Sequence, residues 1–150
     1  MAIAALTFVS GCGGGDGGGG GPAADPARTA VTGTLQSAAS AVARGDPGGA
    51  CRRLSPRGRR ELARRAGLSC GAGVRKLTRR LPGPAAAALE GLVVSDVRVR
   101  GARAAAVVEP PSDLVELARA TGVTYPLSAR VRLVLWHGRW LIDDASAAGR

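Results

Sequence analysis

The spacing of apolar residues changes once along this chain, near residue 92. Before that point apolar residues recur every three to four positions, as at Val31, Leu35, Ala38, Ala39 and Val42, which is typical of helices with one buried face. After it, apolar and polar residues alternate, as in VVSDVRVR at 93–100, which is typical of strands. Helices followed by strands predict an α+β fold, with N-terminal helices packed on an antiparallel sheet.

Capping signals locate the expected helices. A capping side chain followed by proline favours a helix start, because the side chain accepts an N–H of the first turn and proline has no N–H to leave unpaired. This signal occurs at Asp25-Pro26 and at Ser55-Pro56. We expect helices at 26–45, 47–54, 56–67 and 72–81, a further turn or two at 84–92, and a short helix or structured loop at 112–122.

Four strands are expected after the change of period. They span 93–100, 103–109, 124–136 and 139–144, with His137-Gly138 as a two-residue hairpin loop. Strict alternation places Val93, Ser95, Val97 and Val99 on one face of the first strand. In the third strand it places Leu127, Ala129, Val131, Leu133 and Leu135 on one face.

The N-terminus carries an apolar stretch at 2–9, AIAALTFV, directly before Ser10-Gly11-Cys12. The segment VSGC resembles the bacterial lipobox, which implies that residues 1–11 are a signal peptide and that the thiol of Cys12 is lipidated. Two or more acyl chains, such as palmitate, give stable anchoring. Because residues 1–11 contain no Lys or Arg, we expect the start of this signal peptide to lie further upstream.

Residues 12–25 follow as the lipidated cysteine and a glycine-rich tether, because the run has too few side chains to form a core. A phosphate-binding loop is not favoured, since no Gly-Lys-Ser/Thr sequence ends the run. The expected organisation is a signal peptide at 1–11, the tether at 12–25, and a single α+β domain at 26–146. The expected location is the extracytoplasmic face of the cell membrane, reached through the lipid anchor.

Cysteine number agrees with this location. With Cys12 lipidated, Cys51 and Cys70 remain as an even pair, and an exported protein would join them in a disulfide. The alternative is a pair of reduced cysteines in a cytosolic protein. We expect no metal site and no cofactor, because two cysteines without Cys-x-x-Cys spacing and the single His137 fall short of four ligands.

The positive charge is concentrated in residues 52–80, which hold ten arginines, Lys76 and one acid, Glu61. Such a segment is suited to anionic lipid or to an acidic wall polymer. Nucleic acid is not expected as a partner, because export would separate the two and the segment lacks interleaved aromatic residues. The simpler alternative is a set of solvated helix faces in an arginine-rich protein.

Several motifs together resemble the nuclear-transport-factor-two-like superfamily, in particular its small secreted or lipid-anchored bacterial members. They are ARGDPGGACRRLSP, a later SC, VRVRGARAAAVVE and LVLWHGRWLID, within residues 27–145. The resemblance implies a sheet curved into a cone, with helices closing one side. Only four strands are expected here, so the cone would be trimmed. Three aromatic residues are candidates for its pocket: Tyr125, Trp136 and Trp140.

No catalytic residues are assigned, because no acid–base pair or nucleophilic arrangement can be placed by spacing. His137 falls in a hairpin loop, and alternation lets only one of Asp143 and Asp144 point inward. We therefore expect a non-enzymatic binding or accessory module of the envelope. The alternative is an isomerase- or hydrolase-type enzyme that uses an apolar cone. A homodimer through the sheet stays open, since the superfamily often pairs in this way.

Overall fold

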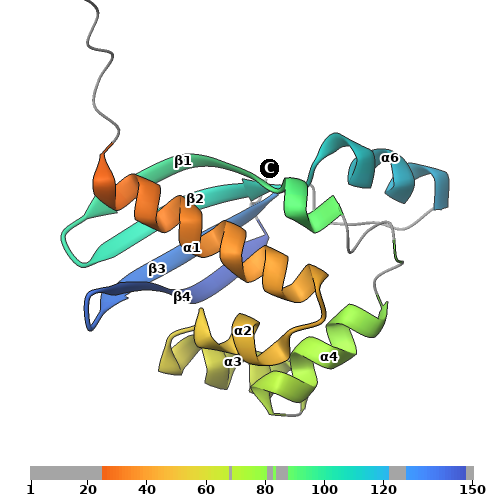
Figure 1. Ribbon diagram of the computed structural model, residues 1–150, viewed down its shortest axis with the longest axis horizontal. Coiled ribbons are helices and arrows are strands. Elements are labelled where there is room, and N and C mark those ends of the chain that lie inside the picture. Colours follow the sequence, from red (N-terminus) through yellow and green to blue (C-terminus); the bar gives the residue numbers. More distant parts are fainter. Residues whose placement is uncertain (1–24, 68, 81–82, 84–87, 122–127, 148–150) are drawn as a thin grey trace, which may run out of the picture.

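The computed structural model describes residues 25–67, 69–80, 83, 88–121 and 128–147. Within them, helices come first and an antiparallel sheet follows, so the α+β prediction is confirmed (Figure 1). The expected signal peptide and nearly all of the expected tether lie outside the described residues. The elements are α1 (Pro26–Ala43), α2 (Pro47–Arg52), α3 (Pro56–Ala66), α4 (Cys70–Arg80), the 3-10 helix η1 (Leu89–Gly91), β1 (Val93–Arg100), β2 (Arg103–Glu109), α6 (Ser112–Thr121), β3 (Ala129–Trp136) and β4 (Arg139–Ala147).

Local capping chemistry begins three of the helices. The carboxylate of Asp25 accepts the N–H of Ala27, and that of Asp46 accepts the N–H of Gly49 at the start of α2. The hydroxyl of Ser55 accepts the N–H of Gly58 at the start of α3. In each case proline follows the cap, which removes one N–H that would otherwise lack a partner. Sequence therefore predicted where α1 and α3 begin to the residue.

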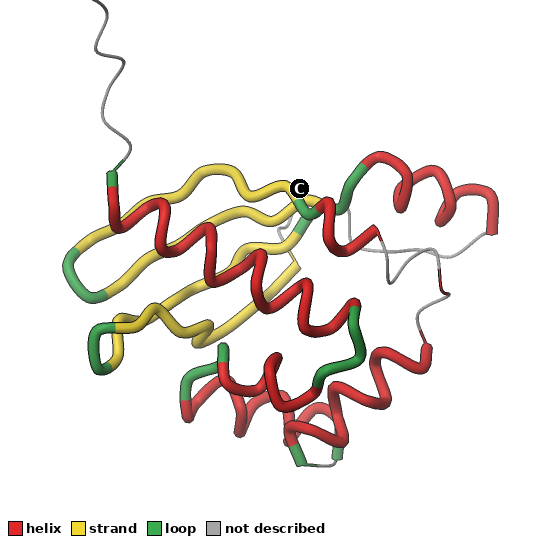
Figure 2. Tube along the Cα trace, in the orientation of Figure 1, coloured by secondary structure: helices red, strands yellow, loops and turns green. Residues whose placement is uncertain are grey.

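The sheet is a meander with the strand order β1-β2-β3-β4 and antiparallel pairing throughout. The predicted hairpin between β3 and β4 is present. His137 has φ 47° and Gly138 has φ 72°, and two successive positive φ angles are the requirement of the tight turn that matches strand twist. Figure 2 shows the strands side by side with α1 lying across them.

A β-bulge changes the inward face of β1. Ser95 pairs with Val107 and Arg98 with Ala105, so β1 has one residue more than β2 between these pairs. As a result Val94 packs on the core, and Val93 is half exposed. The expectation that Val93 shares the inner face with Val97 and Val99 was wrong. Strict alternation fails there because the extra residue shifts the pleat by one position.

A second bulge lies in β4, where Arg132 pairs with Asp144 and Leu133 pairs with Ile142. Asp143 is therefore the additional residue of β4 at this point. Its carboxylate reaches the edge of the sheet, where it accepts the hydroxyl of Ser55 at 2.6 Å. At each bulge the extra residue shifts the alternation of inward and outward side chains by one position.

The helices and the sheet enclose two clusters of buried side chains. The larger lies between α1 and the sheet, and the smaller joins α1, α2 and α4. The larger cluster consists of Val31, Leu35, Ala104, Ala106, Val131, Leu133 and Trp140; the smaller consists of Ala41, Ala50 and Val74.

Residues 53–55 connect the helical part to the sheet. The N–H of Ser55 donates to the carbonyl of Ile142, and the N–H of Ile142 donates to the carbonyl of Arg53, each at 2.8 Å. Leu54 thereby forms an isolated parallel bridge with Ile142 at the edge of β4. The start of α3 is held so close to this edge that a Cβ on Gly58 would lie 2.6 Å from the carbonyl oxygen of Ile142. Only glycine fits there.

This close approach predicts opposite effects for two helical Gly→Ala substitutions. Gly58→Ala should lower the free energy of unfolding by about 1–3 kcal/mol, because α3 has to move away from β4. Gly33→Ala, in the middle of α1, should raise it by about 0.4–1 kcal/mol, because nothing lies within 4 Å of the added Cβ and the unfolded chain loses freedom. Urea unfolding measures both. Equal effects of the two substitutions would contradict the close packing of α3 on β4.

Candidate functional site

An apolar cavity of about 320 Å³ lies between the helices and the inner face of the sheet. Its size falls within the range of small-molecule pockets, at the lower end. The described residues that line it are all apolar, so the interior offers contacts to hydrocarbon and no charged group. They are Leu35, Ala38, Ala39, Val42, Ala50, Leu54, Leu62, Val74, Leu77, Leu89, Leu92, Val108, Val131, Ile142 and Ala145.

The shape of this cavity follows from the residue sizes on α1. Leu35, Ala38, Ala39 and Val42 lie on one face of the helix because they are three to four residues apart. The two alanines in the middle of this face leave space that larger side chains would fill. Across the cavity, Val131 and Ile142 come from neighbouring strands. Alanine is thus the residue that makes the cavity.

The predicted pocket aromatics do not come together around this cavity. Trp140 is buried in the cluster between α1 and the sheet, and Trp136 is half exposed with its ring edge-on to His137 at 5.1 Å. Neither tryptophan lines the cavity. Tyr125 lies outside the described residues. Sequence reasoning places Ala38 and Ala39 on the apolar stripe of the first helix but does not assign them to a pocket.

Asp143 and Asp144 lie in the middle of β4, which continues to Ala147 and not only to residue 144 as expected; both form ion pairs with arginines, and neither lines the apolar cavity. Asp143 lies 3.5 Å from Arg57 as well as bonding Ser55. Asp144 accepts a hydrogen bond from the guanidinium of Arg132, its partner on β3, and this bond lowers the pKa of Asp144. The ion pair of Asp143 links β4 to α3, and that of Asp144 links β4 to β3.

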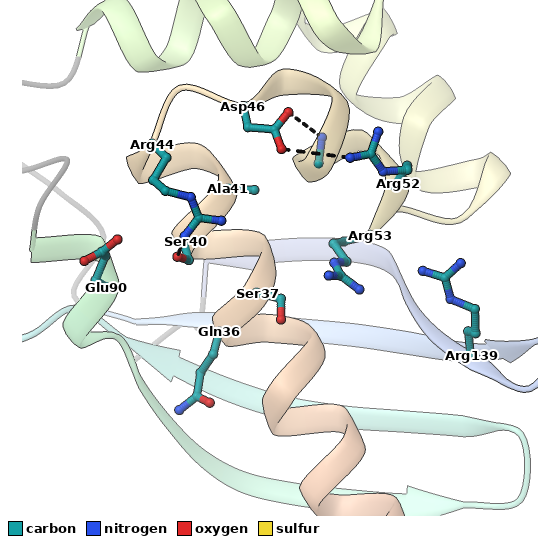
Figure 3. A pocket seen from close by; sticks show the side chains of 11 residues that line it. Gln36, Ser37, Ser40, Ala41, Arg44, Asp46, Arg52, Arg53, Glu90 and Arg139 are labelled. Atoms are coloured by element: carbon teal, nitrogen blue, oxygen red, sulfur yellow. Dashed lines mark hydrogen bonds and ion pairs between the residues drawn. The ribbon is translucent and has the colours of Figure 1, made fainter.

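A second, polar hollow of about 690 Å³ lies on the opposite side of α1, bordered by α2, η1 and the start of β4 (Figure 3). Four arginines surround it, against two acids. Asp46 caps α2 and lies 4.0 Å from Arg52. Apart from Ala41 and Gly49, the other lining residues carry hydroxyl or amide side chains. The polar lining residues are Gln36, Ser37, Ser40, Arg44, Asp46, Arg52, Arg53, Glu90 and Arg139.

Cys51 and Cys70 form a disulfide whose Cα atoms are 6.2 Å apart. The bond joins α2 to the first residue of α4, so it ties together two of the helices that border the apolar cavity. The pairing expected from cysteine number is therefore present. Of the three cysteines of the sequence, only Cys12 is left over, and it lies outside the described residues.

The basic segment 52–80 forms the loop after α2 and the helices α3 and α4. Its single acid, Glu61, accepts hydrogen bonds from Arg64 at 2.7 Å and from Arg65 at 2.6 Å. These bonds, with that to Arg64 the largest cause, lower the pKa of Glu61 to about 2. The acid is thus held ionised by two neighbours, and the other arginines of the segment leave α3 with a strongly positive surface.

The described residues contain neither a membrane-spanning helix nor a metal-binding cluster. No helix in these residues combines the length and apolarity needed to cross a membrane. No cluster of three or more His, Cys, Asp or Glu side chains in them is placed to hold a metal ion. The features that these residues do provide are the apolar cavity, the polar hollow and the basic helices.

No protein-family model matches this chain, and no curated protein or solved structure matches it.

The disulfide predicts a large effect of reduction on stability. Opening a bond between residues 19 apart in sequence should lower the free energy of unfolding by about 3 kcal/mol, because the reduced unfolded chain is less constrained. Urea unfolding of the full chain with and without dithiothreitol measures this change. The Cys12→Ser variant should show the same drop. Equal stability of the oxidised and reduced chains would contradict a structural role for the bond.

Proposed function

We propose that this protein is an envelope lipoprotein, anchored through acylated Cys12 at the extracytoplasmic face of the membrane, and that it acts as a non-enzymatic binding module. The observation that carries the first half is the disulfide. It uses Cys51 and Cys70 and leaves over one cysteine, which stands at the end of the lipobox-like VSGC segment. Stable disulfides are typical of oxidising compartments outside the cytoplasm.

The apolar cavity supports binding as the activity. The described residues that line this cavity are all Leu, Val, Ile or Ala, which disfavours burying a charged group there and favours hydrocarbon. The proposed ligand is therefore a small apolar molecule or one alkyl chain, held between α1 and the sheet.

The basic helices support a second contact, with an anionic surface. Arg57, Arg60 and Arg64 are exposed on α3, and the one acid of the segment is paired with two arginines. On a lipid-anchored protein such a surface would lie within reach of anionic headgroups or wall polymer, which attract basic residues over about a Debye length.

The proposal includes a fold of the nuclear-transport-factor-two-like superfamily. It is supported by helices that close one side of an antiparallel sheet and by a cavity between the two layers. The four-stranded meander corresponds to a trimmed form of the superfamily's cone.

Metabolic labelling tests the anchor. The full chain, preceded by a Lys-rich n-region and expressed in bacteria, should incorporate radioactive palmitate, because the thiol of Cys12 would receive a diacylglyceryl group whose acyl chains carry the label. Cys12→Ser should lose the label completely. Cys51→Ser serves as the matched control and should keep it. Labelling that survives Cys12→Ser, or no labelling at all, would refute the anchor.

Fluorescence of cis-parinaric acid tests the cavity. The probe should brighten on binding to the full chain, and Ala39→Phe should reduce its affinity about tenfold or more, because the new ring occupies the space that the chain would fill. Ala30→Phe is the matched control, since Ala30 is exposed on the same helix and its ring would point to solvent. Similar losses in both variants would count against the cavity as the binding site.

A further inference from the structure

The polar hollow outside α1 brings together arginines that are far apart in the sequence. Arg44 follows α1, Arg52 ends α2, Arg53 follows α2, and Arg139 begins β4. Figure 3 shows the side chains of Arg53 and Arg139 beside α1, on the side of the helix that carries Ser37, and all three residues line the hollow. This site is separate from the apolar cavity, because different faces of α1 line the two.

The pairing of the charges distinguishes two ends of this hollow. At one end the guanidinium of Arg44 bonds the hydroxyl of Ser40, and Arg52 lies near Asp46. At the other end, no described carboxylate lies within 4 Å of the guanidinium of Arg53 or of Arg139. Two like charges facing one space repel each other, and an anion between them would remove that repulsion.

Both arginines are attached to firmly placed backbone. The carbonyl of Arg53 accepts the N–H of Ile142 on β4. Arg139 begins that same strand and pairs with Trp136 across the hairpin. The two side chains therefore start from positions that are fixed relative to each other. Because the backbone of both residues is already ordered, binding has to restrict only their side chains.

We propose that this hollow binds a phosphate ester that also bears hydroxyl groups, with the phosphate between Arg53 and Arg139. Guanidinium groups match phosphate oxygens through paired N–H donors, and a phosphate can accept from two of them at once. Gln36, Ser37 and Ser40 line the adjoining floor on α1, and amide and hydroxyl groups both donate to and accept from sugar hydroxyls. The volume of about 690 Å³ admits a sugar phosphate.

Calorimetric titration of the full, disulfide-bonded chain at about 0.15 M salt tests this site with three probes. Glucose 6-phosphate should bind more tightly than inorganic phosphate, because its hydroxyls add contacts, and glucose should give no measurable heat. Arg53→Gln and Arg139→Gln should each weaken binding of glucose 6-phosphate by about tenfold or more. Circular dichroism checks that both variants remain folded.

Arg100→Gln is the matched control. Arg100 is exposed on β1 and does not line the hollow, and its substitution removes the same charge. It should change the affinity less than about twofold, as expected for a screened surface charge. An equal loss in Arg100→Gln would overturn the proposal in favour of non-specific attraction. Absence of binding by glucose 6-phosphate would overturn it as well.

Competition identifies the source of the phosphate. If vesicles containing phosphatidylinositol displace glucose 6-phosphate, the proposal stands with a lipid headgroup as ligand. If glucose 6-phosphate binds and the vesicles do not displace it, the proposal stands with a free or polymer-borne phosphate ester as ligand. The proposal does not depend on the lipid anchor or on the apolar cavity, since neither the probes nor the variants are shared with those experiments.

Discussion

The hydroxyl of Ser55 is the interaction on which the join between the helices and the sheet depends. This side chain is 2% exposed, and it accepts the N–H of Gly58 while donating to the carboxylate of Asp143. A buried hydroxyl that lost either partner would keep its desolvation cost without compensation. Because the backbone of the same residue pairs with Ile142, one serine begins α3 and fixes it to β4. The cavity and the hollow both take their walls from this join.

Sequence predicted the features that depend on neighbours along the chain. The caps Asp25 and Ser55 and the His137-Gly138 turn are all local, so residue type determined them. The bulges at Asp96 and Asp143 were not predicted. A period of two assumes that every residue of a strand has one partner, and which strand carries an extra residue is decided by packing between strands.

The candidate sites show the same division. The alanine-rich face of α1 is visible in the sequence, because helical spacing assigns Ala38 and Ala39 to the stripe of Leu35. The opposite strands that complete the cavity were partly predicted through the inward position of Val131. The sequence could not predict that Arg53 and Arg139 line the same hollow, because their positions follow from the bridge between Leu54 and Ile142. That bridge joins residues from the two halves of the fold without any local signal.

The same bridge has a consequence for how copies of this chain meet. In the sheet, β1 and β4 are the outer strands, and an outer strand exposes N–H and C=O groups on which a foreign strand can add. Residues 53–55 occupy part of this edge at β4. At β1 the bulge interrupts the row of backbone groups, and Asp96, Arg98 and Arg100 stand exposed along it. A foreign strand is thus hindered from pairing with either outer strand of the sheet. Contacts between copies of the chain would have to use side-chain surfaces instead.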